Sequence, residues 1–247
     1  MLKEDKKMAE RRRPGGELAS RPLHFFWVVD CSGSMMGDKI ATANFAIKDA
    51  IPGMRSAAEE NPNAQLLIRT LRFETGAQWI TPSPVPVDEF EWEPLELGGL
   101  TSMGMAFDML ADQLEMPPMS EKALPPVIVL LSDGNPTDDY KTGLTRLLNL
   151  PWGRKAVKIA IAIGQDVDIS ILEEFTGNRE LVLQANNADQ LAKMIKWAST
   201  VAKQVSSPVS RPTQVDATGT PASSNVPQMV DVNNIPDIDD DPVGDVW

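Results

Sequence analysis

Three short apolar runs stand out along the chain, at residues 24–30, 127–132 and 157–163. Each has the length of one strand. Nearly every position in them is apolar, which is typical of strands covered on both faces of a sheet. A half-exposed strand would instead alternate apolar and polar residues. The runs therefore predict central strands of a parallel sheet.

Between and after these runs, apolar residues recur every three or four positions, which is the period of an amphipathic helix. Three such faces are formed by Ile40, Ala43, Ile47, Ile51 and Met54, by Phe107, Leu110, Ala111 and Leu114, and by Leu191, Met194, Ile195, Ala198 and Ala202. Residues 64–73 and 77–80 predict two more strands joined by a turn at Thr75-Gly76. A helix over 169–175 and a short strand near 181–183 follow. The alternation predicts a doubly wound α/β fold with a mostly parallel sheet and helices on both faces.

The two ends of the chain differ in composition from its middle. Residues 1–21 are polar and charged, whereas residues 206–247 are rich in Pro, Ser, Thr, Asn and Asp. From residue 208 onward there is one basic residue, Arg211, against seven aspartates. Such segments cannot bury enough apolar surface to fold. We therefore expect one folded domain over residues 22–205 between two disordered ends.

Composition limits the class of function. The chain has 247 residues, 42% of them hydrophobic, and a net charge of -12, which argues against nucleic acid as a partner. Its one cysteine, Cys31, excludes an intrachain disulfide and is expected to be a small packed residue rather than a reactive thiol. No apolar run is long enough to cross a membrane, and the N-terminal segment does not read as a signal peptide. We expect a cytoplasmic protein with no membrane partner.

Side chains that carry oxygen follow two of the predicted strands. Asp30, Ser32 and Ser34 alternate after the first run, Thr101 precedes a helix in "LGGLTSMG", and Asp133 follows the second run in "LLSDG". Ligands of doubly wound sheets bind at the carboxyl ends of strands, so we expect these five side chains to converge. Two carboxylates and three hydroxyls favour Mg²⁺ or Mn²⁺ over zinc. Ca²⁺ ranks lower because it usually recruits more carboxylates.

The same residues resemble a known family. Asp30-Cys31-Ser32-Gly33-Ser34 is similar to the D-x-S-x-S motif of von Willebrand factor A domains, and Thr101 and Asp133 match that family's distant threonine and aspartate. In the family, the five residues form the metal-ion-dependent adhesion site. The resemblance, which covers residues 22–205, implies that Ser32 and Ser34 coordinate the metal directly. It implies that Thr101 and Asp133 coordinate it directly or through water, and that Asp30 binds through water or holds the loop. A protein partner would fill the open position with an Asp or Glu.

Three longer phrases look most like the bacterial TerY-like branch of this family. They are "GGLTSMGMAFDML", "LPPVIVLLSDGNPTDD" and "PWGRKAVKIAIAIG". Members of that branch are associated with serine/threonine kinases and PPM-type phosphatases in stress-response and tellurite-resistance systems. The resemblance implies an adaptor that is not an enzyme, with a kinase or phosphatase as partner. Thr213, three residues before Asp216, also resembles the phosphothreonine peptides that forkhead-associated domains favour, so such a domain is a further candidate partner.

An enzyme remains the alternative. An aspartate after a strand also occurs in phosphotransferases, so Asp30 and Asp133 leave a metal-dependent phosphoesterase open. The aspartate that such enzymes carry two residues later is Ser32 here, and no general base is at hand. The one histidine, His24, opens the strand that ends at Asp30, and we expect its role to be structural.

Two further sets of residues near the candidate site allow more than one interpretation. Met35, Met36, Met103 and Met105 flank the site, where they form either an apolar rim for a partner or part of the core. Asp138 and Asp139 follow the loop that carries Asp133, and we expect them to cap the next helix rather than to bind metal.

Overall fold

The computed structural model describes residues 20–133, 135–165, 167–206 and 235. Within these residues one sheet of seven strands has the order β3-β2-β1-β5-β6-β7, and β4 pairs with β2. The strands are β1 (Arg21–Asp30), β2 (Ala64–Glu74), β3 (Gly76–Trp79), β4 (Val85–Pro86), β5 (Val127–Ser132), β6 (Val157–Ile163) and β7 (Val182–Ala185). The pairs of β1 with β2 and β5, of β5 with β6 and of β6 with β7 are parallel, whereas β3 and β4 run antiparallel to β2.

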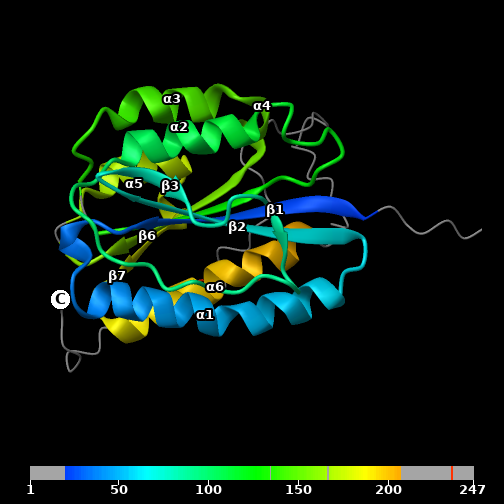
Figure 1. Cartoon of the computed structure of the whole chain (residues 1–247), viewed down its shortest axis with the longest axis horizontal. Coiled ribbons are helices and arrows are strands. Elements are labelled where there is room, and N and C mark those ends of the chain that lie inside the picture. The colour runs from blue at the N-terminus through cyan, green and yellow to red at the C-terminus, as the bar shows by residue number, and fades with distance from the viewer. Residues whose placement is uncertain (1–19, 134, 166, 207–234, 236–247) are drawn as a thin grey trace, which may run out of the picture.

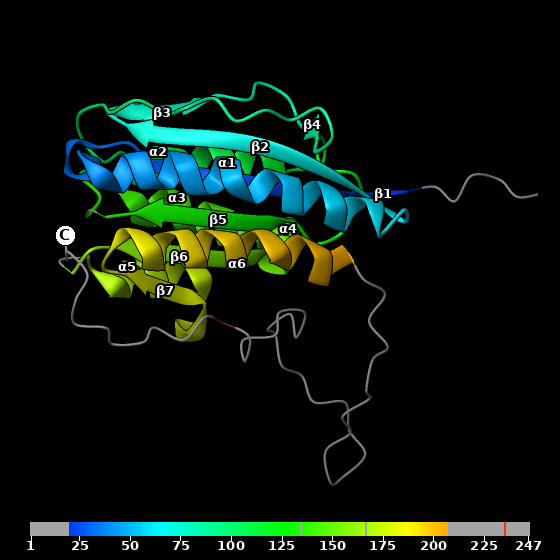
Figure 2. The same ribbon diagram turned by 90° about the horizontal axis from the view of Figure 1, so that it is seen from below.

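Helices cover both faces of the sheet (Figure 1). One face carries α1 (Asp38–Glu59) and α6 (Ala188–Ser206), which lie side by side in Figure 2 and pack against each other. The other carries α2 (Met103–Leu114), α3 (Tyr140–Asn149), α4 (Pro151–Lys155) and α5 (Ile169–Thr176). Short 3-10 turns, η1 and η2, occupy Gly33–Met35 and Arg179–Leu181. The doubly wound α/β fold predicted from the alternation of strands and helices is confirmed.

The position of β1 explains its apolar sequence. β1 lies between β2 and β5 in the middle of the sheet, and helices cover the sheet on both faces (Figure 1). Phe25, Trp27 and Val29 join the core on the α1 and α6 side, whereas Phe26 and Val28 join the core on the other side. Full burial of one such side chain contributes about 2 kcal/mol to stability. The central strand therefore anchors the loop that follows it to both cores.

The predicted elements match the structure with small differences at their ends. The predicted strands at 127–132 and 157–163 have the observed bounds of β5 and β6. β1 begins earlier than predicted, at Arg21, because its backbone pairs with β2 from the pair Arg21–Ala64 onward. α5 ends at Thr176 and is capped by Gly177, whose φ of 69° is the left-handed geometry that glycine adopts without strain. The prediction of a short strand near 181–183 is met by β7, which starts at Val182.

The expected disordered ends, 1–21 and 206–247, lie almost entirely outside the described residues, and so does Thr213. Ile235 is described, and it packs partly buried against the core on the α1 and α6 side. Over the part of the chain that the structure covers, no helix is both long and apolar enough to span a bilayer.

Candidate metal centre

The site predicted from the sequence lies at the carboxyl edge of the sheet. β1 and β5 pair in parallel, with Val29 opposite Leu131, so the residues that follow both strands come out side by side. The first loop leaves β1 at Asp30 and runs through η1, the second loop is the segment 97–102 before α2, and the third loop leaves β5 at Ser132 and Asp133. Parallel pairing therefore brings together residues that are about a hundred positions apart in the chain.

Asp30 holds the first loop. Its Oδ1 accepts a hydrogen bond from the backbone N–H of Ser32 at 2.9 Å, and its Oδ2 accepts one from the Ser132 hydroxyl at 2.6 Å. The residue is fully buried. Burial raises the pKa of the Asp30 carboxyl, while the bonds from Ser132 and Ser32 oppose the shift. Both oxygens are engaged inside the protein, which suits a residue that shapes the loop.

Three oxygens from two loops form a continuous chain of contacts. The hydroxyl oxygens of Ser32 and Ser34 lie 2.9 Å apart, and the Ser34 hydroxyl donates to Oδ1 of Asp133 at 2.7 Å. Ser32 and Asp133 are buried and Ser34, which lies between them, is exposed, so the chain of contacts reaches the surface at Ser34. These three predicted site residues are therefore brought together by the fold.

Thr101 is fixed between the other two loops. The N–H of Gly33 donates to the carbonyl of Gly99 at 3.0 Å, which joins the first and second loops. The N–H of Thr101 donates to the Thr137 hydroxyl at 3.2 Å, and the Thr101 carbonyl accepts from the Thr137 N–H at 2.9 Å. These bonds join the second and third loops. Thr101 is buried at their junction, and both of these bonds are made by its backbone.

The turn between β2 and β3 supports the second loop. The Glu74 carboxylate accepts from the Gly99 N–H at 3.0 Å, and the Thr75 hydroxyl accepts from the Leu100 N–H at 3.0 Å. The amides of Thr75 and Gly99 hold the pKa of the Glu74 carboxyl below its usual range. Sequence reasoning missed this role, because these contacts join positions 25 residues apart.

Lys39 was also missed. It lies in the first turn of α1, and its Nζ is 2.6 Å from Oδ2 of Asp133 and 3.4 Å from the carbonyl oxygen of Ser34. The Asp133 side chain is fully buried, whereas that of Lys39 is 20% exposed. A lysine within a few residues of a D-x-S-x-S loop was the available sequence signal.

Asp138 and Asp139 both cap helices, but different ones. Asp139 accepts from the N–H of Thr142 and caps α3, as predicted. The prediction that Asp138 caps the same helix was wrong. Its carboxylate instead caps α2 and accepts from the N–H groups of Gly104 and Met105 at 2.9 and 3.0 Å, because α2 begins beside the third loop.

The methionines near the site divide into two pairs. Met35 and Met103 are fully buried and belong to the core. Met36 is 73% exposed and Met105 49% exposed. Two leucines of the second loop are exposed as well. We call these four residues the apolar rim: Met36, Leu97, Leu100 and Met105. Each of the four lies in or directly beside a loop that builds the site.

The residues present fit a hard divalent cation. Among the described residues there is no group of three or more His, Cys, Asp or Glu side chains that could hold a metal. An ion at this edge would therefore depend on hydroxyl oxygens together with Asp133, a donor set of the kind that Mg²⁺-type ions prefer. The Lys39 ammonium shows that a cation is accommodated against Asp133.

The geometry disfavours the phosphoesterase alternative. Asp30 is buried with both oxygens hydrogen-bonded, so it cannot present a nucleophile to a substrate. His24 precedes Asp30 by six residues of extended strand, a span of about 20 Å. Burial and the charge of Arg69 lower the pKa of His24 to about 4.

The cysteine that follows Asp30 is buried as well. Burial raises the pKa of the Cys31 thiol to about 12, which fits the packed residue that was predicted.

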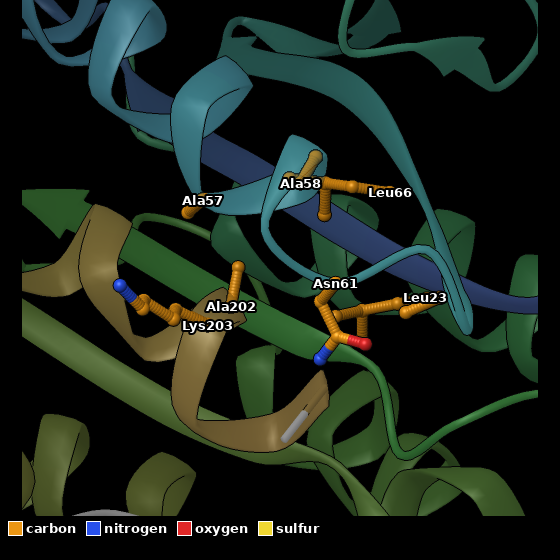
Figure 3. A pocket seen from close by; sticks show the side chains of 8 residues that line it. Leu23, Ala57, Ala58, Asn61, Leu66, Ala202 and Lys203 are labelled. Carbon is orange, nitrogen blue, oxygen red and sulfur yellow. The ribbon is translucent and has the colours of Figure 1, made fainter.

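A small cavity lies at the opposite end of the sheet (Figure 3). It is lined by Leu23, Ala57, Ala58, Asn61, Ala64, Leu66, Ala202 and Lys203. Its volume of about 10 Å³ leaves room for one water at most. It is therefore too small to bind a substrate.

No family model matches the chain, and no curated protein sequence does. Solved structures do match. A von Willebrand factor type A protein from Catenulispora acidiphila is 16% identical with a TM-score of 0.57, covering 74% of this chain and 43% of that one. The ArnB paralog VWA2 from Sulfolobus acidocaldarius is 20% identical with a TM-score of 0.54, covering 72% and 45%.

Proximal thread matrix protein 1 from the mussel byssus, in a structure with a zinc-occupied MIDAS motif, is 18% identical with a TM-score of 0.54, covering 76% of this chain and 47% of that one. The chain spans less than half the length of each of these three structures. At these identities the likeness shows the fold alone. This chain has the fold of von Willebrand factor A domains, as its motif resemblance implied.

Proposed function

We propose that this protein is a metal-dependent protein-binding domain and not an enzyme. Ser32, Ser34, Thr101 and Asp133 would hold Mg²⁺ or Mn²⁺, and Asp30 would hold the loop that presents the two serines. The observation that carries the proposal is the chain of hydroxyl and carboxylate oxygens from Ser32 through Ser34 to Asp133, with contacts of 2.9 and 2.7 Å at the carboxyl edge of the sheet. The mussel protein, whose MIDAS motif holds zinc, supports a divalent ion at the corresponding place.

When bound, the metal supplies an open coordination position for an oxygen ligand from outside. A divalent ion held mostly by neutral hydroxyls keeps a strong attraction for a further carboxylate. The partner would therefore supply an Asp or Glu. The residues of this chain would orient the metal, because Ser34 and Asp133 are linked to each other and the backbone of Thr101 is held by Thr137.

The apolar rim extends this proposal to the partner's surface. Met36, Leu97, Leu100 and Met105 are exposed although they are large and apolar, and each lies in or beside a loop of the site. Large apolar residues exposed in the loops around one site are a feature that protein interaction sites share, and methionine adapts to varied partners. We propose that the partner's acidic residue is flanked by apolar side chains that cover this rim.

The similarity of three phrases to the TerY-like branch supports a cellular setting. On this similarity the partner would be a serine/threonine kinase or a PPM-type phosphatase, and the spacing of Thr213 and Asp216 would add a forkhead-associated domain protein. The setting would be a bacterial stress-response or tellurite-resistance system in the cytoplasm. The high net negative charge of -12 fits this choice of protein partners over nucleic acid.

Titration calorimetry with Mg²⁺, Mn²⁺ and Ca²⁺ tests the metal. The wild type should bind Mg²⁺ or Mn²⁺, and Ser32→Ala/Ser34→Ala should lose the binding while keeping the fold. Ser56→Ala, an exposed serine of α1, serves as the matched control. Equal affinities in the double variant and the wild type would remove the site.

Pulldown from the native cell tests the partner. Capture should be lost in EDTA and in Ser32→Ala/Ser34→Ala, and retained in Ser56→Ala. A partner that is captured equally under all these conditions would bind another face. Turnover of a generic phosphate ester that requires Mg²⁺ and is lost on Asp30→Asn would instead favour the enzyme.

A further inference from the structure

We propose that Lys39 is a built-in competitor for the metal. Its ammonium occupies the Asp133 side of the site in the metal-free protein, and a divalent ion must displace it to reach the carboxylate. This inference rests on the metal site of the proposed function. It adds a residue outside the D-x-S-x-S motif that sets the metal concentration at which the site fills.

The contacts of Lys39 are those of a cation seated in a binding site. Nζ lies 2.6 Å from Oδ2 of Asp133 and 3.4 Å from the carbonyl oxygen of Ser34. The other oxygen of Asp133, Oδ1, accepts the Ser34 hydroxyl. The ammonium therefore binds the same carboxylate and the same serine that are proposed to hold the metal.

The ion pair of Lys39 with Asp133 is energetically important because the carboxylate is buried. The Asp133 side chain is fully buried, and a buried carboxylate is costly unless a cation or hydrogen-bond donors compensate its charge. Lys39 supplies that cation without metal. A divalent ion bound at Asp133 and an ammonium within a few ångströms of it would repel each other strongly in this partly buried setting. The two cations therefore exclude each other at Oδ2.

The Lys39 side chain can turn into solvent when it is displaced. Its side chain is 20% exposed, and it lies in the first turn of α1, at the surface of the domain. Gly164, at the carboxyl end of β6, borders the ammonium, since a Cβ there would lie 3.6 Å from Nζ. Displacement requires only rotation of a flexible side chain toward solvent, which costs little. The exchange needs no change in the backbone.

Two consequences follow for the metal-free protein. Asp133 and Ser34 stay in the arrangement that a metal needs, because the ammonium holds them there. The apparent metal affinity is lowered by the fraction of molecules in which Lys39 occupies the site. Lys39 thus lowers the apparent metal affinity and at the same time keeps the site preorganised.

Titration calorimetry with Mg²⁺ tests this with three variants. Lys39→Met keeps the length of the side chain and removes the charge, Lys39→Arg keeps the charge, and Lys48→Met removes an exposed charge of the same helix as a control. We expect Lys39→Met to bind Mg²⁺ about tenfold more tightly or better, and the other two to stay near the wild type. Lys39→Gln repeats the test if Lys39→Met does not fold.

The thermal stability of the metal-free protein gives a second readout. In EDTA, Lys39→Met should melt below the wild type because Asp133 loses its cation, and saturating Mg²⁺ should restore it. Equal Mg²⁺ affinity in Lys39→Met and the wild type would overturn the role of Lys39 while leaving the metal site in place. Equal tightening in Lys48→Met would also overturn it, since the effect would then be one of general charge. Absence of Mg²⁺ binding in every variant would end both proposals.

Discussion

Gly98 lies against the side chain of Glu74 so closely that a Cβ on the glycine would overlap the carboxylate. The same carboxylate accepts the N–H of the next residue, Gly99. This contact presses the second loop of the site onto the end of β2, and Thr101 follows two residues later. The turn between β2 and β3 therefore helps, together with Thr137, to position Thr101 without a metal.

Gly98→Ala should damage both the fold and the site. The added methyl group must push Glu74 aside, and overpacking of this kind typically costs about 1–3 kcal/mol. We expect a lower urea midpoint and weaker Mg²⁺ binding. The contrasting variant is Gly53→Ala in α1, where a Cβ would meet nothing within 4 Å. There, helix propensity predicts a gain of about 0.5–1 kcal/mol. Equal urea midpoints for the two variants would mean that the contact of Gly98 with Glu74 does not contribute to stability.

Glu74→Ala should weaken metal binding more than it weakens the fold. The variant removes the acceptor of the Thr75 and Gly99 amides, so the second loop loosens while both cores stay intact. We expect a lower Mg²⁺ affinity by calorimetry and a nearly unchanged melting temperature in EDTA. Glu121→Ala, an exposed glutamate near the amino end of β5, should change neither. A large loss of stability in Glu74→Ala without an effect on metal would contradict this role.

The Cys31 thiol should be inert in the folded protein. It is fully buried, and burial raises its pKa to about 12, so the reactive thiolate is scarce at neutral pH. It is the one cysteine of the chain, which makes the signal of a thiol reagent unambiguous. Labelling should be slow in buffer, rapid in denaturant, and slower still with saturating Mg²⁺. Fast labelling of the native protein would show that the loop after β1 opens readily.

How much the sequence could predict depends on the range of the contacts. The bounds of β5 and β6 were predictable because both strands are buried along their whole length, which leaves an unbroken apolar run. The convergence of Ser32, Ser34 and Asp133 was predictable because parallel strands end at the same edge.

Other features leave too little pattern in the sequence. The helix α3 buries only Gly143, Leu144 and Leu147 of its ten residues, so its period is hard to detect. α4 has five residues and β4 has two, which is too short for any period. The contacts that complete the site, such as those of Lys39 with Asp133, join distant positions and became visible only in the fold.

His24 should make the protein less stable in mild acid. Its ring stacks on Phe26 with centroids 6.0 Å apart, and Arg69 adds a positive charge nearby. Burial first, and the charge of Arg69 second, lower its pKa from 6.5 to about 4. At pH 5, His24 is therefore protonated in the unfolded chain and neutral in the folded protein. The contribution of neutral His24 to the free energy of unfolding is complete above pH 6.5 and is lost as the pH drops toward 4. At pH 5 the loss is about 2 kcal/mol.

Urea unfolding at pH 7 and pH 5, with the wild type and His24→Gln, isolates this contribution from the carboxylates that titrate in the same range. Both proteins share every carboxylate, so the difference between their pH dependences belongs to His24. We expect the wild type to lose about 2 kcal/mol more than His24→Gln between the two pH values. The sign follows from the depressed pKa of a base, since protonation favours the unfolded chain. A wild type that loses no more stability than His24→Gln would mean that the imidazole reaches water in the folded protein.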